Sequence, residues 1–223
     1  MAIIELKNVT ETYEAGERVT PIEHINLSIE KGDFLAVSGE SGIGKSTLLT
    51  VAGGLLRPTA GEVLIDGRDY WKMSDQEQTQ IRNQKIGYLF QSIQLVQALT
   101  VEENLKLVSD ISGKKVTKKE MQEILTRFGL EEKKDSLPHQ LSGGQKRRVM
   151  LAVTSVRDPE VILADEPTND LDAGWTKVVM ETFKKWTEQG KTVILVTHDQ
   201  KLWEQADCTY IIEDRKLKTV ETK

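Results

Sequence analysis

The chain has 223 residues, a formal net charge of -5 and a single cysteine, Cys208. This length suits one domain, or one domain with a small lobe, and is enough to bury a sizeable core. Because there is no excess of positive charge and no intrachain disulfide is possible, we expect no nucleic-acid partner and a reducing compartment such as the cytosol.

Short apolar runs separated by glycine or polar turns predict a β-rich first third. The expected strands are Ile3–Val9, Ile25–Ile29, Phe34–Ser38 and Glu62–Asp66. The third of these leads directly into a glycine-rich loop, from which we expect a helix over Lys45–Ala52. No apolar run approaches the roughly 18 residues that a membrane helix needs, so we expect another chain to supply any membrane span.

The middle and the last third differ in their apolar spacing. Residues from about Ser92 to Pro138 combine many charges with helical spacing, which predicts a helical lobe inserted into a sheet domain. Around and after it, predicted strands and helices follow one another: Lys85–Phe90, Gln145–Arg157, Val161–Asp165, Trp175–Gln189 and Thr192–Thr197. Such alternation favours a parallel sheet covered by helices and joined by right-handed crossovers.

The glycine-rich loop reads Gly39-Glu40-Ser41-Gly42-Ile43-Gly44-Lys45-Ser46 and matches the phosphate-loop pattern. Its glycines allow the backbone N–H groups and the following helix N-terminus to converge on a polyphosphate. Lys45 can reach the β- and γ-phosphate oxygens, and the Ser46 hydroxyl suits Mg²⁺. The strand before the loop and the helix after it argue against a chance glycine turn. The loop, with the adjoining Thr47, therefore predicts binding of ATP with Mg²⁺.

Two acids end the apolar strand that follows the helical lobe. Asp165 sits where such a strand presents a carboxylate to the magnesium ion, and Glu166 follows it at once. Glu166 can act as a general base on the attacking water. A strand that ends in two acids is common, and a solvated strand end is the plain alternative. Its position downstream of a phosphate loop makes the catalytic interpretation the stronger one.

A second glycine motif, Leu141-Ser142-Gly143-Gly144-Gln145, stands before another predicted helix. The two glycines, the Ser142 hydroxyl and the helix dipole make a second anion site. One nucleotide does not need two such sites from a single chain. We therefore expect this loop to meet the γ-phosphate held by another subunit.

With these motifs in this order, the whole chain resembles the ATP-binding cassette (ABC) ATPases. The resemblance identifies Gly39–Ser46 as the Walker A loop, Asp165 and Glu166 as Walker B and the catalytic glutamate, and Leu141–Gln145 as the signature motif. It further implies roles for single residues: Tyr13 stacks on adenine, Gln91 lies near the magnesium and the lytic water, Asp172 of the D-loop faces the partner subunit, and His198 contacts the γ-phosphate. Three plainer interpretations stay open, namely an edge aromatic for Tyr13, a strand-end polar residue for Gln91 and a structural histidine for His198.

The resemblance also implies the fold and the domain organisation. We expect an α/β P-loop NTPase core with an N-terminal antiparallel β subdomain and an inserted α-helical subdomain. The chain would be one ABC ATPase domain over residues 1–223, with residues 1–91 and 158–223 in the RecA-like core and 92–157 in the helical subdomain that carries the signature motif.

The mechanism that the resemblance implies needs two copies, which hold two ATP molecules head to tail. One copy supplies the catalytic residues Lys45, Gln91, Glu166 and His198, and its Ser46, Gln91 and Asp165 bind Mg²⁺, partly through water. The other copy supplies Ser142, Gly143, Gly144, Gln145 and Asp172.

Three segments are similar to the lipoprotein-release and macrolide-export cassettes, the LolD and MacB type: Leu55–Glu62, Ile81–Gln91 and Ala164–Thr168. That group implies a separately encoded membrane-spanning permease, room for an extracytoplasmic adaptor, export or extraction of a peptide, lipid or drug, and a cytoplasmic location at the inner face of the membrane. Two departures are a basic signature helix over Gln145–Val153 and Asn169-Asp170 where Gly-Asn is more common. Neither removes a catalytic group.

Apolar residues after Gln91 suggest where a permease docks, because they fall in an expected exposed linker. They are Ile93, Leu95, Val96, Ala98 and Leu99. Internal packing of the helical lobe is the alternative.

At the level of the whole protein, the alternatives are a non-transport ABC ATPase of DNA-repair, translation or iron–sulfur type, a cell-division type complex that signals without moving a substrate, and a nucleotide-binding module without catalysis. The chain has no coiled-coil insertion and only one cassette, which argues against the DNA-repair and translation types. Glu166 and His198 are intact, which argues against a module without catalysis. The sequence hardly separates signalling from transport.

Overall fold

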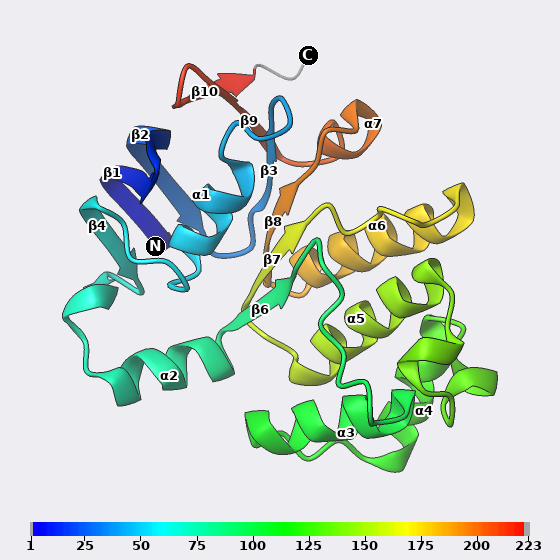
Figure 1. Ribbon diagram of the computed structural model, residues 1–223. Coiled ribbons are helices and arrows are strands. Elements are labelled where there is room, and N and C mark those ends of the chain that lie inside the picture. The colour runs from blue at the N-terminus through cyan, green and yellow to red at the C-terminus, as the bar shows by residue number, and fades with distance from the viewer. Residues whose placement is uncertain (1, 221–223) are drawn as a thin grey trace.

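Two sheets of different kinds organise the chain, as the computed structural model of residues 2–220 shows (Figure 1). An antiparallel sheet has the order β2-β1-β4-β5, and a second sheet has the order β10-β9-β3-β8-β7-β6. The strand bounds are β1 Ala2–Ala15, β2 Glu17–Glu30, β3 Phe34–Ser38, β4 Ala60–Ile65, β5 Arg68–Asp69, β6 Ile86–Leu89, β7 Val161–Asp165, β8 Thr192–Val196, β9 Cys208–Glu213 and β10 Lys216–Val220. Neighbouring strands of the second sheet are parallel, except that β10 runs antiparallel to β9.

Helices cover both faces of the parallel sheet (Figure 1). Their bounds are α1 Lys45–Ala52, α2 Asp75–Gln84, α3 Val101–Ser112, α4 Lys118–Arg127, α5 Gly143–Arg157, α6 Ala173–Glu188 and α7 Gln200–Trp203. The helix α1 contacts both sheets, whereas α5 and α6 pack on strands of the parallel sheet from the opposite face, and α3 and α4 pack on α5.

The central strands are apolar along their whole length because both of their faces are buried. In β3, Phe34 and Ala36 belong to the core shared with α5 and α6, whereas Leu35 and Val37 belong to the core shared with α1 and the antiparallel sheet. The period-two alternation of a strand sends neighbouring side chains to opposite faces. Continuous apolar runs of this kind are typical of parallel sheets covered by helices on both sides.

Capping boxes set the starts of the helices in the lobe that follows β6. Thr100, Thr117 and Ser142 each accept a hydrogen bond from the backbone N–H three residues on. In return, the side chain at that third position, a glutamate or a glutamine, accepts from the capping residue's own N–H. This reciprocal arrangement satisfies two of the N–H groups that a helix start leaves unpaired.

The structure confirms the α/β class, the strand Val161–Asp165 and the helix Lys45–Ala52. It extends β1 and β2 well beyond the predicted strands and begins the signature helix at Gly143 rather than at Gln145. The helix α2 was not predicted, because it buries none of its residues and so carries no apolar period. The strands β9 and β10 were not predicted either. The proposed division at residues 91/92 and 157/158 stays a prediction.

The expectation of exposed apolar side chains after Gln91 is wrong for Leu95 and only partly met by Ile93, and docking of a permease on this linker stays a prediction. Leu95 is buried in the core below α5, and Ile93 is partly buried against the same core. The linker turns these side chains inward because α3 and α5 offer them an apolar surface there, which is the internal-packing alternative. Val96 does remain exposed. Among residues 2–220, no helix combines the length and the apolar character needed to cross a membrane.

Candidate nucleotide-binding site

The carboxyl ends of four adjacent parallel strands, β3, β8, β7 and β6, bring the predicted phosphate-binding and catalytic residues to one edge of the sheet. The phosphate loop follows β3, Asp165 and Glu166 come at the end of β7, His198 follows β8, and Gln91 follows β6. Ligands of open α/β sheets bind at this edge, where loops leave the sheet.

Close packing explains the last glycine of the phosphate loop. Gly44 has a φ of 116°, and a Cβ atom at this position would lie 2.8 Å from the carbonyl oxygen of Pro21. Glycine therefore fits both the left-handed backbone and the contact with β2. Gly44 is also the N-cap of α1 and has no side chain to occupy the first N–H groups of the helix. Those groups are free to point at an anion.

Lys45 is buried at the base of the loop, with 8% of its surface exposed. Its ammonium group donates hydrogen bonds to the carbonyl oxygens of Gly39 and Glu40, each at 2.7 Å. The loop thus holds the cation beside the cavity with two neutral acceptors and, within residues 2–220, no carboxylate in salt-bridge contact. A polyphosphate that entered the cavity would meet a positive charge already in place.

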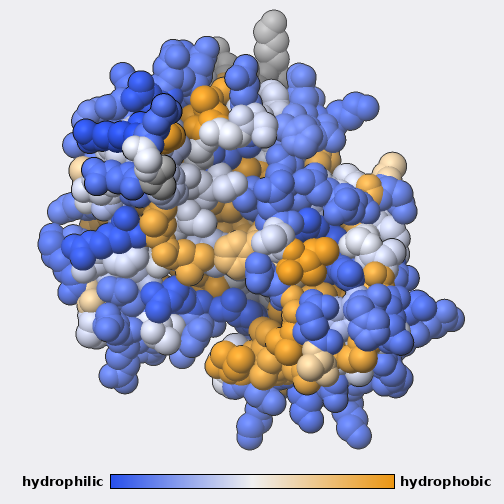
Figure 2. Space-filling model, in the orientation of Figure 1, coloured by the Kyte–Doolittle hydropathy of each residue, from blue (hydrophilic) through white to orange (hydrophobic). Residues whose placement is uncertain are grey.

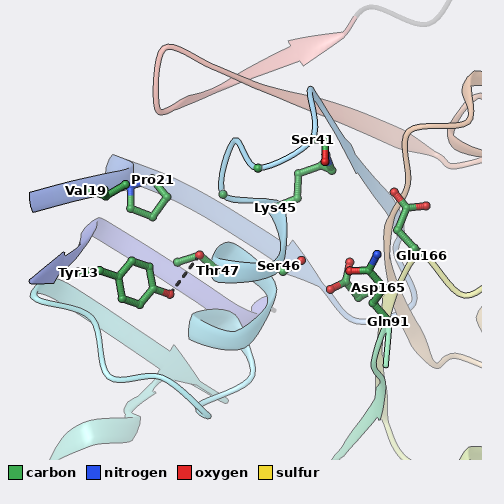
Figure 3. Close-up of a pocket in the computed structure, with 12 residues that line it drawn as sticks. Tyr13, Val19, Pro21, Ser41, Lys45, Ser46, Thr47, Gln91, Asp165 and Glu166 are labelled. Carbon is green, nitrogen blue, oxygen red and sulfur yellow. Dashed lines mark hydrogen bonds between the residues drawn. The ribbon is translucent and has the colours of Figure 1, made fainter. Parts of the chain in front are cut away.

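The phosphate loop opens into a cavity of about 290 Å³ (Figure 3). It is lined by Tyr13, Val19, Pro21, Ser41, Gly42, Gly44, Lys45, Ser46, Thr47, Gln91, Asp165 and Glu166. Of the predicted residues of this site, Gly39, Glu40, Ile43 and His198 are not among the lining residues. Val19 and Pro21 line the cavity but were not predicted from the sequence. Val19 pairs with Tyr13 across β1 and β2, so an exposed apolar side chain lies beside the predicted aromatic. This strand pairing identifies Val19 as a residue of the site.

Tyr13 lies at the end of the cavity nearest the antiparallel sheet (Figure 3). The residue is 39% exposed, and its hydroxyl lies 3.2 Å from the hydroxyl of Thr47 at the start of α1. An aromatic face held in this way can stack on a planar ring. This position suits a base at the opposite end of the cavity from Asp165.

Asp165, Ser46 and Gln91 gather at the other end (Figure 3). Burial raises the pKa of Asp165, and the nearby Glu166 adds to that effect, whereas the hydrogen bond from Ser46 and the charges of Lys45 and Arg147 oppose it. Carboxylate, hydroxyl and amide oxygens are the hard donors that Mg²⁺ prefers, and Mg²⁺ usually keeps waters and phosphate oxygens among its ligands. Across residues 2–220 no group of three or more acids, histidines or cysteines could hold a metal. The oxygens of Asp165, Ser46 and Gln91 fit an ion whose other ligands are waters and the phosphate oxygens of a nucleotide.

Glu166 and His198 form a pair beside the cavity. Glu166 Oε1 accepts from the backbone N–H of His198 at 3.1 Å and lies 2.8 Å from the imidazole Nδ1. The side chain of Glu166 is only 10% exposed, whereas that of His198 is 70% exposed. Glu166 also has a φ of 46°, which is uncommon for a residue with a side chain and often accompanies function. The carboxylate is thus held in one orientation at the edge of the cavity.

The signature residues line a different cavity, of about 450 Å³. Its lining residues are Ser142, Gly143, Gly144, Gln145, Arg148, Asp170, Leu171, Asp172 and Trp175. The two loops that form it pack closely, since a Cβ on Gly144 would lie 2.8 Å from the carbonyl oxygen of Asp170. Among the described residues, none lines both this cavity and the phosphate-loop cavity. The structure therefore brings the residues predicted to act in trans together with one another, but apart from the phosphate loop.

The model of the ABC transporter family matches residues 22–169. The chain belongs to the ABC transporter family. An ABC transporter ATP-binding protein of Thermotoga maritima is 38% identical over 224 residues, which covers 99% of this chain and 96% of that protein. The macrolide export ATP-binding/permease protein MacB of Aggregatibacter actinomycetemcomitans is 38% identical, over 97% of this chain but only 34% of MacB.

A solved structure supports the same assignment for the cassette. The dimeric structure of a post-hydrolysis state of the ATP-binding cassette MJ0796, bound to ADP and Pi, has a TM-score of 0.91 and 37% identity, with 99% of each chain covered. A relative of that name comes from Methanocaldococcus jannaschii. The fold expected from the resemblance is confirmed, and the chain is an ABC-type ATPase.

Proposed function

We propose that two copies of this cassette close on two ATP molecules and drive a separate membrane-spanning permease. The observation that carries the proposal is the separation of the two cavities. Lys45, Asp165 and Glu166 line one, and Ser142 and Gly144 line the other. Both cavities carry donors suited to phosphate, and a head-to-tail pair would complete each phosphate-loop cavity with the signature loop of the other copy. The dimeric form of the related MJ0796 cassette supports this arrangement.

Each residue has a defined task in the proposed reaction. Lys45 and the loop N–H groups bind the β- and γ-phosphates, and Tyr13 stacks on adenine. Ser46, Asp165 and Gln91 would hold Mg²⁺, which when bound neutralises charge on the phosphate oxygens. Glu166 accepts a proton from the attacking water. His198 orients the carboxylate of Glu166 and, in the closed dimer, contacts the γ-phosphate.

The proposed cargo is a peptide, lipid or drug that is exported or extracted, as in MacB- and LolD-like systems. Support comes from the similarity to MacB, whose name joins an ATP-binding and a permease function, while this chain spans about a third of its length. The cassette would then lie at the cytoplasmic face of the membrane, held there by the permease, and an extracytoplasmic adaptor would complete the complex.

An apolar groove between β6 and α3 offers the permease a docking site. It encloses about 360 Å³, and its apolar lining includes Leu55, Tyr88, Phe90, Val108 and Ile111. Ile111 is 61% exposed and Leu55 is 45% exposed. Figure 2 shows hydrophobic surface gathered over α3 beside a hollow in this face of the molecule. We place the docked permease segment here, rather than on the linker residues Ile93 and Leu95.

The substitution Glu166→Gln tests the core of the proposal. The amide keeps the size of the side chain but cannot take up a proton, so we expect a loss of turnover of roughly 10²–10³-fold. Binding of ATP should change by no more than about twofold, because the phosphate loop is untouched. Size-exclusion chromatography with light scattering should show a dimer in ATP and a monomer without it.

Glu188→Gln is the control, because Glu188 is an exposed acid at the far end of α6. Its turnover should equal that of the parent. Parental turnover in Glu166→Gln, or an ATP-bound variant that stays monomeric, would contradict the proposal.

A further inference from the structure

The helix α5, which begins at the signature loop, carries a charged side chain that is buried in the protein interior. Arg147 of α5 is only 2% exposed, which is rare for arginine. Its Nη1 donates to the carbonyl oxygen of Phe90 at 2.7 Å, and its Nη2 donates to that of Gln91 at 2.6 Å. Its Nε finds no hydrogen-bond partner among residues 2–220. The guanidinium therefore donates hydrogen bonds to two consecutive carbonyl groups.

Those carbonyls belong to the loop that presents Gln91 to the phosphate-loop cavity. The strand β6 ends at Leu89, so Phe90 and Gln91 lie beyond the sheet. A third bond secures the same segment, because the N–H of Gln94 donates to the sulfur of Met150, also on α5, at 3.3 Å. The path of the chain through Gln91 is thus held mainly by one helix rather than by the sheet.

The same helix carries the signature residues at its N-terminal end. Ser142 caps α5, Gly143 and Gly144 form its first turn, and Arg147 follows about one turn later. A helix transmits a displacement along its length because its backbone bonds are internal. A shift of the signature loop, on meeting the second copy's nucleotide, would therefore move the guanidinium and with it the backbone of Gln91.

Nearby charges also favour a charged guanidinium at the position of Arg147. The carboxylates of Asp165 and Asp170 are the groups that favour the charged form of Arg147, against the cost of burial. Asp165 lines the phosphate-loop cavity, and Asp170 lines the signature cavity. The guanidinium thus lies in the field of one acid from each site.

We propose that Arg147 is a positioning residue, which holds the backbone of Gln91 in place for hydrolysis and links it to the signature loop. Arg147 lines neither cavity, so it acts through Gln91 and does not touch substrate. The inference rests on the proposed role of Gln91 at the metal and the lytic water.

A second arginine of α5 provides a matched comparison. Arg157 also donates to two backbone carbonyls, those of Arg82 at 2.7 Å and Asn83 at 3.1 Å, near the end of α2. It shares the helix, the residue type and the kind of bond with Arg147. It differs in holding a segment that carries no residue of the nucleotide site, although Arg82, Asn83 and Arg157 line the proposed docking groove, which the isolated cassette does not use.

The test compares Arg147→Met and Arg157→Met in the isolated cassette. For Arg147→Met we expect turnover to fall roughly 10- to 100-fold, since misplacement of a catalytic group by about 1 Å can cost 10²-fold. The affinity for ATP, measured without turnover, should stay within about twofold. Hydrogen exchange of the backbone amides of residues 90–96 should become several-fold faster, with or without nucleotide. Arg157→Met should keep parental turnover, with faster exchange confined to residues near 82–86.

Arg147→Lys, which keeps the charge and can donate to the same carbonyls, should recover part of the turnover. If Arg147→Met fails to fold, as shown by circular dichroism, Arg147→Gln replaces it, because the shorter amide retains a donor. The proposal is overturned by parental turnover or unchanged exchange in the folded Arg147 variant. It is also overturned if Arg157→Met loses turnover to the same degree.

A double-substitution cycle separates this inference from the proposed function. If Arg147 acts through Gln91, Arg147→Met should reduce turnover much less in a Gln91→Ala background than in the parent. Fully additive losses would overturn the inference alone. Parental turnover of the single Gln91→Ala variant would instead remove the proposed role of Gln91, and the inference would fall with it.

Discussion

At the scale of single residues, Asp165 illustrates a cost that the site imposes on the fold. Its side chain is mostly buried at the end of β7, next to a second acid, Glu166. Burial raises the pKa of Asp165, and the adjacent Glu166 raises it further. A carboxylate in this position disfavours its own charged form until a cation arrives. The nucleotide-free cassette is therefore less stable than its packing alone would allow.

We predict that Asp165→Asn stabilises the nucleotide-free cassette at pH 7. In the parent, the raised pKa means that the folded state keeps the proton to a higher pH than the unfolded chain does. The free energy of unfolding therefore falls as the pH rises from the ordinary pKa of Asp through the raised one. The variant lacks this loss, so its free energy of unfolding and its Tm at pH 7 should exceed those of the parent.

Calorimetry at pH 7 and near pH 4 checks this prediction. The Tm advantage of the variant should shrink at the lower pH, because the raised pKa of Asp165 lets the folded parent take up the proton as the pH falls. Turnover with Mg²⁺ should be lost in the variant at both pH values. A variant that is no more stable than the parent at pH 7 would show that the hydrogen bond from Ser46 and the nearby cations outweigh burial.

Single residues also show which contacts could be predicted from the sequence and which could not. Lys45, Ser46, Asp165 and Glu166 were predicted because they fall in contiguous motifs whose spacing encodes their chemistry. Arg147 was noted only as part of an unusually basic helix, because its partners lie 56 and 57 residues away in the sequence. Such contacts leave no local pattern.

At the scale of elements, the start of α5 has two tasks that can be separated. Ser142 caps the helix by accepting from the N–H of Gln145 at 3.2 Å, and we propose that it also binds the second copy's nucleotide. Thr117 caps α4 in the same way, by accepting from the N–H of Glu120 at 3.2 Å. Both caps belong to capping boxes, so they make comparable contributions to helix stability.

We predict that Ser142→Ala and Thr117→Ala each lower the free energy of unfolding by about 1 kcal/mol, the typical value of such a cap. Only Ser142→Ala should also lower turnover, by roughly tenfold or more, since it removes a donor to a phosphate. Thermal unfolding and steady-state hydrolysis measure the two effects. Equal turnover in the two variants would contradict a role for Ser142 beyond capping.

Mixing Ser142→Ala with Lys45→Ala tests whether that role is exercised in trans. Each variant alone should hydrolyse ATP slowly. In a mixed dimer, one site combines both substitutions. The second site is intact, because the Ser142→Ala copy supplies its Lys45 and the Lys45→Ala copy supplies its Ser142. With random pairing, the mixture should regain about a quarter of the parental rate. Absence of recovery would mean that each copy completes its own site.

At the scale of the whole molecule, the groove beside α3 predicts how the cassette reaches a membrane. Ile111 is a large exposed apolar side chain in this groove, whereas Val96 is exposed on the linker outside it. We predict that Ile111→Glu releases the cassette from native membranes, because it places a charge in the apolar seat. Val96→Glu should leave the cassette attached. Membrane fractionation with quantitative immunoblotting measures the distribution.

Turnover of the detached cassette is the control, and it should be parental for both variants because neither residue lines a nucleotide cavity. Release by Val96→Glu instead of Ile111→Glu would move the docking site to the linker. Retention of both variants would remove the groove from the proposal.

The sequence by itself predicted the residues that we propose to bind phosphate and metal, and it determined the order of the central strands along the chain and the family. It could do so because a phosphate loop needs glycine, lysine and serine at fixed spacing, and because strands buried on both faces are continuously apolar. The central strand Val161–Asp165 and the helix Lys45–Ala52 were predicted residue by residue for these reasons.

Only the tertiary structure decided which distant segments meet. It put Val19 beside Tyr13, turned Leu95 into the core, and placed the carbonyls of Phe90 and Gln91 against Arg147. It also separated the phosphate-loop cavity from the signature cavity, which no spacing along the chain reveals. The physical reason is the same in each case: burial and hydrogen bonding between segments far apart in sequence depend on how the sheets and helices pack, and that packing is a property of the whole chain.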